Sequence, residues 1–270
     1  MSDAAPVSYR VRPRVWIGLA IWVAYVLLVY VVQLLAGVPY PDLGENGGTL
    51  FLGAGLSLII GTIFLAVTAS LLGWWRPALF DRQHSHHRWP IFVPAVMVVA
   101  LVINLLSTDW ASYDGGFFAA SIVLLLVGFT EEMTTRGLLL VGLRSRLSEP
   151  WVWFITSAAF GLMHLINALS GQSLGLTIQQ VGLAFLGGTV FYILRRTTGT
   201  LIWAMVLHGF WDFSTFAVGH GTPGPLAALA GAINLIAGIL GLIVVAFTFR
   251  GVSERTAVPA AHEATEKAAA

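Results

Sequence analysis

The sequence predicts an all-α, polytopic membrane protein with about eight transmembrane helices and both termini in the cytoplasm. Three observations lead to this prediction. First, 57% of the 270 residues are hydrophobic and only 10% are charged, whereas a soluble globular chain is about 25% charged. Second, apolar stretches long enough to cross a bilayer recur along the chain. Third, the basic residues collect in alternate connections between those stretches.

Each span is recognised as a stretch of roughly 20 apolar residues, the length that crosses the hydrocarbon core as a helix. Eight stretches fit: 15–37, 49–74, 90–107, 117–143, 151–169, 176–194, 199–218 and 226–249. The third is the shortest and contains Pro94. The first follows an Arg-rich leader but is too long for a signal-peptide core, so we expect it to be retained as a helix.

The basic residues give an independent test of this division, because Lys and Arg accumulate in cytoplasmic loops. Thirteen of the 14 basic residues precede the first span, follow the last, or lie after the second, fourth and sixth spans. The other connections contain none, so both termini are predicted to be cytoplasmic, which suits a bacterial inner membrane. Only Arg136 departs from this pattern, because it lies within the fourth span.

The loops are too short for a second folded unit, so residues 1–250 are expected to form a single transmembrane domain surrounded by membrane lipids. Residues 251–270, rich in Ala with Glu and Lys, are expected to form a disordered cytoplasmic tail. The net charge of +1 leaves no basic field for nucleic acid. The absence of cysteine excludes a thiol nucleophile and a Cys-ligated metal site.

Ionisable side chains inside the predicted spans are the candidate functional residues, because a charge at mid-bilayer costs about 2.5–3.5 kcal/mol on insertion scales. Six residues qualify: Glu131, Glu132 and Arg136 in the fourth span, His164 in the fifth, and His208 and Asp212 in the seventh. Counting residues along each helix gives them overlapping depths. The three carboxylates and two imidazoles among them are therefore predicted to surround one cavity, which opens toward the cytoplasmic leaflet.

The spacing within the spans suggests how these residues pair. Glu132 and Arg136 are four residues apart and share a helix face, which favours an ion pair. Glu131 points about 100° away around the helix and has no cation of its own, which suits a general base or acid. His208 and Asp212 also share a face, so Asp212 can fix the tautomer of His208. The alternative is purely structural: salt bridges and hydrogen bonds that fix helix packing.

Three motifs, in order along the chain, resemble those of a known family: Glu131-Glu132-x-x-x-Arg136, Phe160-x-x-x-His164 and His208-x-x-x-Asp212. The family is the CPBP family, which comprises type II CAAX prenyl endopeptidases, bacteriocin-processing enzymes and their Abi relatives. Each motif alone is weak, but the three together in this order and spacing are fairly specific. The similar stretch runs from 117 to 220, less than half of the chain.

The resemblance implies an intramembrane endopeptidase that acts on a membrane-associated peptide, either a prenylated CAAX protein or a leader, in a cavity open to the cytosol. By motif position, Glu131 is expected to activate water and His164 to hold it, while Glu132 and Arg136 form the supporting ion pair. His208 and Asp212 are expected to bind the polarised carbonyl or position the site. Because the family often has Asn where this chain has Asp212, the oxyanion role passes to His208.

Two mechanisms and two other functions remain open at this point. A glutamate-type mechanism needs no ion, whereas a metal-dependent one would use Glu131, His164, His208 and Asp212 as ligands, with zinc the first choice. The chain lacks the His-Glu-x-x-His signature of helical zinc proteases. The other functions are a non-catalytic bacteriocin-immunity or scaffolding membrane protein and, less favoured, a proton-coupled transporter.

Overall fold

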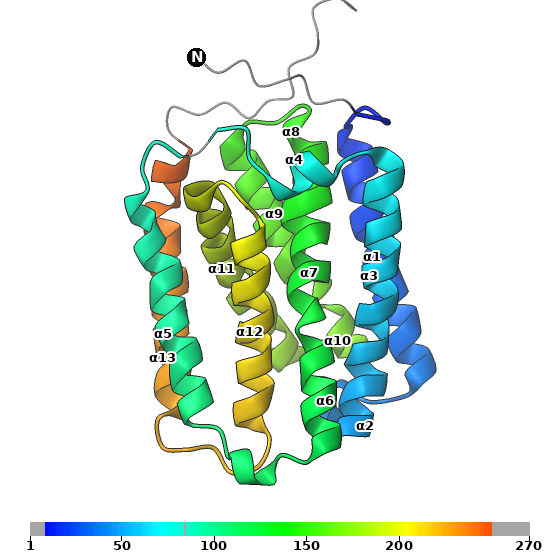
Figure 1. Cartoon of the computed structure of the whole chain (residues 1–270), viewed down its shortest axis with the longest axis vertical. Coiled ribbons are helices and arrows are strands. Elements are labelled where there is room, and N and C mark those ends of the chain that lie inside the picture. Colours follow the sequence, from blue (N-terminus) through cyan, green and yellow to red (C-terminus); the bar gives the residue numbers. More distant parts are fainter. Residues whose placement is uncertain (1–8, 84, 250–270) are drawn as a thin grey trace, which may run out of the picture.

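The computed structural model describes residues 9–83 and 85–249, and the predicted tail at 251–270 lies outside these residues. Every regular element in the described part is helical, and β pairing there is limited to one isolated bridge between Phe80 and Thr200. The long helices run side by side along the long axis of the molecule (Figure 1). The chain is an all-α polytopic membrane protein, as the sequence predicts.

Seven of the eight predicted spans are long and apolar enough to cross a membrane in the described part of the chain. They are Val15–Ala36, Gly47–Leu72, Trp89–Leu106, Gly115–Arg144, Glu149–Leu169, Leu174–Thr198 and Ala227–Thr248. The stretch predicted at 199–218 forms α12 (Ile202–Gly219), which lies between α5 (Phe92–Leu106) and α7 (Leu126–Glu132) (Figure 1). It is missing from the seven because polar residues, His208 and Asp212 among them, lower its mean hydropathy.

Several spans are made of more than one helical segment. The first span is the single helix α1 (Val15–Ala36). The second consists of α2 (Gly47–Leu50), η2 (Phe51–Gly55) and α3 (Leu56–Leu72). The third consists of η3 (Trp89–Ile91) and α5 (Phe92–Leu106). The connections between them contain η1 (Tyr40–Asp42) and α4 (Trp75–Leu79), and η4 (Trp110–Ser112) follows α5. Pro94 lies in the first turn of α5, where it removes no helical hydrogen bond, so the third span is preserved.

The second half of the chain carries the predicted site. The fourth span consists of α6 (Gly115–Leu124), α7 (Leu126–Glu132), the π-helical η5 (Met133–Leu139) and α8 (Leu140–Arg144). It is followed by α9 (Glu149–Met163), α10 (Ile166–Leu169), α11 (Leu174–Thr198), α12, α13 (Ala227–Val244) and η6 (Val245–Thr248). The π-helical turn directly after Glu132 is a local irregularity of the kind that often marks functional sites.

Short polar residues start several helices. The side chain of Asn46 accepts hydrogen bonds from two backbone N–H groups at the start of α2, and Asp114 accepts one from Phe117 at the start of α6. These caps satisfy N–H groups that have no partner within the helix. At the other end of α11, Gly199 adopts a left-handed conformation with φ of 77°, which allows the chain to turn sharply into α12.

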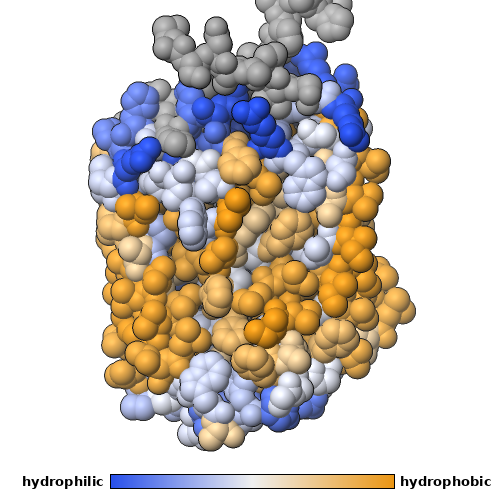
Figure 2. Space-filling view, viewed as in Figure 1, coloured by the Kyte–Doolittle hydropathy of each residue, from blue (hydrophilic) through white to orange (hydrophobic). Residues whose placement is uncertain are grey.

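The two ends of the bundle differ in charge, and Figure 2 shows an apolar band between them. One end, called the Arg-rich end below, carries Arg10, Arg12, Arg14, Arg76, Arg82, Arg88 and Arg146. The other, called the acidic end, carries Asp42, Glu45, Asp109 and Asp114 in its connections. Large apolar side chains of the long helices, such as Leu35 on α1 and Leu106 on α5, are exposed, as expected for a surface that faces lipid.

Two glycines bring α7 and α12 into close contact. A Cβ atom added at Gly128 on α7 would lie 2.0 Å from the carbonyl oxygen of Met205 on α12. A Cβ added at Gly209 would lie 2.7 Å from the carbonyl oxygen of Leu125. Small residues allow this approach of two backbones, which is a common device in membrane helix packing. The contact places the middle of α12 directly against the Glu131-Glu132 segment of α7.

We expect Gly128→Ala to destabilise the protein by about 2 kcal/mol or more, because the added methyl group overlaps the backbone of α12. The measurement is the thermal midpoint in detergent. Gly231→Ala on α13 is the matched control, since a Cβ added there meets nothing within 4 Å. Equal thermal midpoints for the two variants would show that α12 does not lie in close contact with Gly128.

Candidate active site

The structure brings the six ionisable residues predicted from the sequence into one region in the middle of the bundle. Glu131 and Glu132 end α7, and Arg136 follows in η5. His164 is the residue at which α9 ends, so it lies at a break between α9 and α10. His208 and Asp212 lie one turn apart on α12.

Arg136 and Glu132 form the ion pair predicted from their spacing. Arg136 Nε donates to Glu132 Oε2 at 2.7 Å, and Nη2 donates to Oε1, so the contact is bidentate. Both side chains are fully buried. The guanidinium carbon also lies 4.2 Å from the ring centroid of Phe160, within the range of a cation–π contact. This pairing explains how Arg136 is accommodated inside the fourth span.

His208 is oriented by Glu132 rather than by Asp212. Its Nδ1 lies 2.9 Å from Glu132 Oε1, whereas its Nε2 lies 3.9 Å from Asp212 Oδ1, beyond hydrogen-bond distance. The suggestion that Asp212 fixes the His208 tautomer is therefore wrong. The close contact of α7 and α12 brings the Glu132 carboxylate within reach of the imidazole, and stacking on Phe191 at 4.7 Å holds the ring from another side.

Glu131 is the carboxylate that faces open space. Its side chain is 15% exposed, and its Oε2 has no hydrogen-bond partner among the described residues. The imidazole of His208, which is positively charged only when protonated, lies next to it, with Nε2 3.7 Å from Oε2. A polar atom left without a partner in an apolar surrounding is rare in folded proteins and indicates a site that binds water or substrate.

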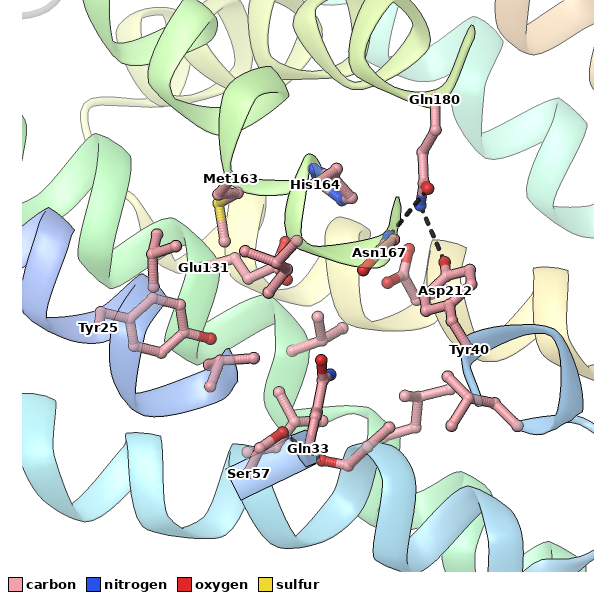
Figure 3. A pocket seen from close by; sticks show the side chains of 18 of the residues that line it. Tyr25, Gln33, Tyr40, Ser57, Glu131, Met163, His164, Asn167, Gln180 and Asp212 are labelled. Atoms are coloured by element: carbon pink, nitrogen blue, oxygen red, sulfur yellow. Dashed lines mark hydrogen bonds between the residues drawn. The ribbon is translucent and has the colours of Figure 1, made fainter. Parts of the chain in front are cut away.

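His164 presents one ring nitrogen to the same space. Its Nδ1 lies 2.9 Å from the carbonyl oxygen of Phe160, which can only accept a hydrogen bond. Nδ1 therefore carries the proton in the neutral ring, and Nε2 is left as an acceptor. Figure 3 shows the imidazole beside the carboxylate of Glu131.

A cavity of about 100 Å³ lies next to these groups, enough for several water molecules. Glu131, His164 and Asp212 line it (Figure 3). It also has uncharged polar walls that the sequence analysis missed: Tyr25, Gln33, Tyr40, Ser57, Asn167 and Gln180. Only ionisable side chains stood out in the sequence, although an amide such as Gln33, Asn167 or Gln180 inside an apolar span is also costly to bury.

Three of these missed residues form a hydrogen-bonded rim. Asn167 Nδ2 donates to Gln180 Oε1 at 2.9 Å, and Gln180 Nε2 donates to the phenol oxygen of Tyr40 at 2.9 Å (Figure 3). Burial raises the pKa of the Tyr40 phenol to about 12, so the group keeps its proton at neutral pH. That proton is free to be donated to a further acceptor, because Tyr40 accepts the bond from Gln180.

The four residues considered as metal ligands lie near one another, with Nε2 of His208 3.7 Å from Glu131 Oε2 and 3.9 Å from Asp212 Oδ1. Within residues 9–83 and 85–249 there is no group of three or more His, Asp or Glu side chains arranged to hold a metal ion. His208 Nδ1 is engaged by Glu132, and His164 Nδ1 by the Phe160 carbonyl. These contacts leave Nε2 of both rings available, and zinc-bound histidines usually have such a contact at their other nitrogen. Dependence on zinc therefore stays a prediction.

Three arginines assigned to cytoplasmic loops are buried in helices instead. Arg144 ends α8, and Arg195 and Arg196 lie in the last turn of α11. All three pair with Asp81: Arg144 Nη1 at 2.9 Å, Arg195 Nη2 at 2.8 Å, and Arg196 through Nη1. Burial alone would raise the pKa of Asp81, but the three guanidinium groups hold it well below its usual range.

Comparison with known proteins identifies the segment that contains the site. Residues 113–214 match the family model described as Type II CAAX prenyl endopeptidase Rce1-like. This range closely follows the stretch marked out by the three motifs and contains all six ionisable residues of the candidate site. No curated protein matches the chain.

Proposed function

Because this chain belongs to the CPBP family of CAAX proteases, we propose that it hydrolyses a peptide bond of a membrane-associated peptide, with Glu131 as the base that activates water. Family membership implies peptidase activity, and the roles of individual residues are our proposal. The observation that carries it is the Glu131 carboxylate. It has an oxygen without a hydrogen bond and faces a cavity shared with His164.

The first step is activation of water. A water molecule in the cavity donates one hydrogen bond to Glu131 and one to Nε2 of His164, since both groups are acceptors there. As the water oxygen attacks the scissile carbonyl, Glu131 takes its proton. His164 keeps the water oriented, and its own position is fixed by the bond from Nδ1 to the Phe160 carbonyl.

The second step is stabilisation and collapse of the tetrahedral intermediate. With Nδ1–H of His208 directed to Glu132, Nε2 bears a hydrogen only when the ring is protonated. In that form it donates to the oxyanion, and the buried position of His208 makes this hydrogen bond stronger than it would be in water. The proton taken by Glu131 then passes to the leaving nitrogen as the C–N bond breaks. The second water proton moves from the new carboxylic acid to the released amine, so the products are one carboxylate and one ammonium group.

Glu132 and Arg136 act through His208 in this scheme. Arg136 fixes Glu132, and Glu132 fixes the ring orientation of His208. They are positioning residues, because the contacts that fix them are to each other, to His208 and to aromatic rings. This mechanism needs no metal ion, and its dependence on a metal is tested below.

The test is peptide cleavage by the purified protein in proteoliposomes. The probes are fluorescence-quenched peptides carried on a single transmembrane segment, together with a farnesylated CAAX peptide. We expect cleavage by the wild type and a loss of about 100-fold or more in His164→Ala and His208→Ala. Arg146→Ala is the control, since that side chain is exposed at the Arg-rich end.

Each other outcome has a defined meaning. Equal activity in all variants would contradict the assignment of His164 and His208 to the active site. If the wild type cleaved none of the probes, the non-catalytic function would be favoured. We expect activity to survive a metal chelator. Loss of activity with the chelator and its recovery with zinc would replace the glutamate mechanism by the metal-dependent one.

A further inference from the structure

We infer that the cavity is reached from the acidic end of the bundle, on the extracytoplasmic side, and that the substrate is a peptide segment exposed on that side. The second part rests on the proposed function. The inference reverses the sequence-based expectation of an opening toward the cytoplasm. Three observations carry it: where the cavity lies, what closes the Arg-rich end, and how charge is distributed between the two ends.

The cavity extends from Glu131 toward the acidic end only. On α1, which runs from the Arg-rich to the acidic end, the lining residues lie between Tyr25, near its middle, and Gln33, close to its last turn. The loop residues Tyr40 and Leu43 belong to the acidic end itself. The other walls follow the same pattern, since Asn167 in α10 and Gln180 in the second turn of α11 lie on either side of a connection at the acidic end.

The Arg-rich end is closed above the site by buried ion pairs. Arg136 and Glu132 lie next to Glu131 and are fully buried. Beyond them, Arg195 donates to the backbone carbonyl of Arg136 and, with its other nitrogens, binds Asp81. Arg144 joins Asp81 to Glu149 through contacts of 2.9 and 2.7 Å. This network fills the space between the site and the Arg-rich loops with side chains that already bind one another.

The charge distribution assigns the two ends to the two sides of the membrane. The positive-inside rule counts basic residues in loops, so Arg144, Arg195 and Arg196, which are buried in the Asp81 network, are not counted. The seven that define the Arg-rich end still lie outside the spans or at their ends, and the connections of the acidic end contain no Lys or Arg. By the positive-inside rule, the Arg-rich end is cytoplasmic and the acidic end is extracytoplasmic.

An opening at the acidic end restricts the class of substrate. The CAAX sequence of a cytosolic prenylated protein lies at the opposite face, behind the ion-pair network. A segment that has crossed the membrane, or that leaves a transmembrane helix on the outer side, reaches Glu131 directly. The rim of Tyr40, Asn167 and Gln180 offers uncharged donors and acceptors, which match the N–H and C=O groups of an extended peptide backbone.

The absence of cysteine from the chain permits a direct test by single-cysteine labelling. Gln33→Cys and Val29→Cys place a thiol in the cavity. Leu27→Cys, on the exposed apolar side of the same helix, is the matched lipid-facing control. Glu45→Cys reports on the acidic end and Arg146→Cys on the Arg-rich end. Intact cells and inside-out vesicles are treated with the small, impermeant reagent 2-sulfonatoethyl methanethiosulfonate, and remaining thiols are counted after denaturation.

We expect the two cavity thiols to react in intact cells together with Glu45→Cys, while Arg146→Cys reacts only in inside-out vesicles and Leu27→Cys in neither. Reaction of the cavity thiols only in inside-out vesicles would overturn the inference. So would reaction of Glu45→Cys from the inside, which would invert the orientation. Reaction from neither side would show that no aqueous path reaches the cavity, and would equally contradict it.

The labelling result does not depend on catalysis, so it separates this inference from the proposed function. If the cavity thiols react from outside but no peptide is cleaved, the access route stands and the peptidase mechanism falls. If peptides are cleaved but the thiols react only from inside, the mechanism stands and the access route falls. In either case the outcome assigns the failure to one of the two proposals.

Discussion

Glu131→Gln is expected to lower the rate of peptide cleavage by about 10²- to 10⁴-fold, the usual contribution of a general base, while leaving the protein folded. Glutamine keeps the volume of the side chain but cannot take a proton from water at neutral pH. The substitution removes no hydrogen bond through Oε2, because that atom has none. The measurements are kcat in proteoliposomes and the thermal midpoint in detergent.

The control for this variant is Glu45→Gln, which removes an exposed carboxylate at the acidic end and is expected to keep full activity. The shape of the pH profile gives a second readout, because loss of the base should remove the acidic limb of the wild-type curve. If Glu131→Gln kept more than a tenth of the wild-type kcat with an unchanged midpoint, Glu131 would not be the base.

Glu132→Gln should have the largest effect on stability. It leaves Arg136 as a fully buried guanidinium without a carboxylate, and breaking a buried ion pair in this way costs about 3–5 kcal/mol. It also replaces the carboxylate that orients His208 with a neutral amide, whose single oxygen is the weaker acceptor. We therefore expect both a lower thermal midpoint and a loss of cleavage activity in whatever fraction remains folded.

A double variant separates the structural role of Glu132 from its effect on His208. Glu132→Gln combined with Arg136→Met removes both buried charges, so much of the lost thermal midpoint should return. Activity should stay low, because His208 still lacks its carboxylate partner. Recovery of activity along with stability would falsify the positioning role and leave Glu132 with a purely structural one.

Much of the candidate site was predictable because buried charge is expensive. In a chain whose spans are almost entirely apolar, the six ionisable residues within them stand out, and the Glu132–Arg136 pair follows from helical spacing alone. The partner of His208 did not follow. Spacing favoured Asp212 on the same helix, but the glycines at 128 and 209 bring α7 close enough for Glu132 to take that position.

Two other features depended on contacts between distant parts of the chain. Arg144 and the Arg195–Arg196 pair lie at span ends, where the sequence suggests loops exposed to water. Asp81, in the connection before the third span, draws them into one buried network. The uncharged walls of the cavity were also missed, since an isolated Gln or Asn in a span does not reveal which helix it faces.

The sequence by itself determined that the protein lies in a lipid bilayer. It also determined the position of nearly every span and the few ionisable residues whose burial in lipid is costly. These follow from transfer energies that each residue carries wherever it lies. The tertiary structure alone decided which carboxylate orients His208, which end of the bundle is closed, and where the cavity leads. Those features depend on distances between helices, which are set by side-chain packing among residues far apart along the chain.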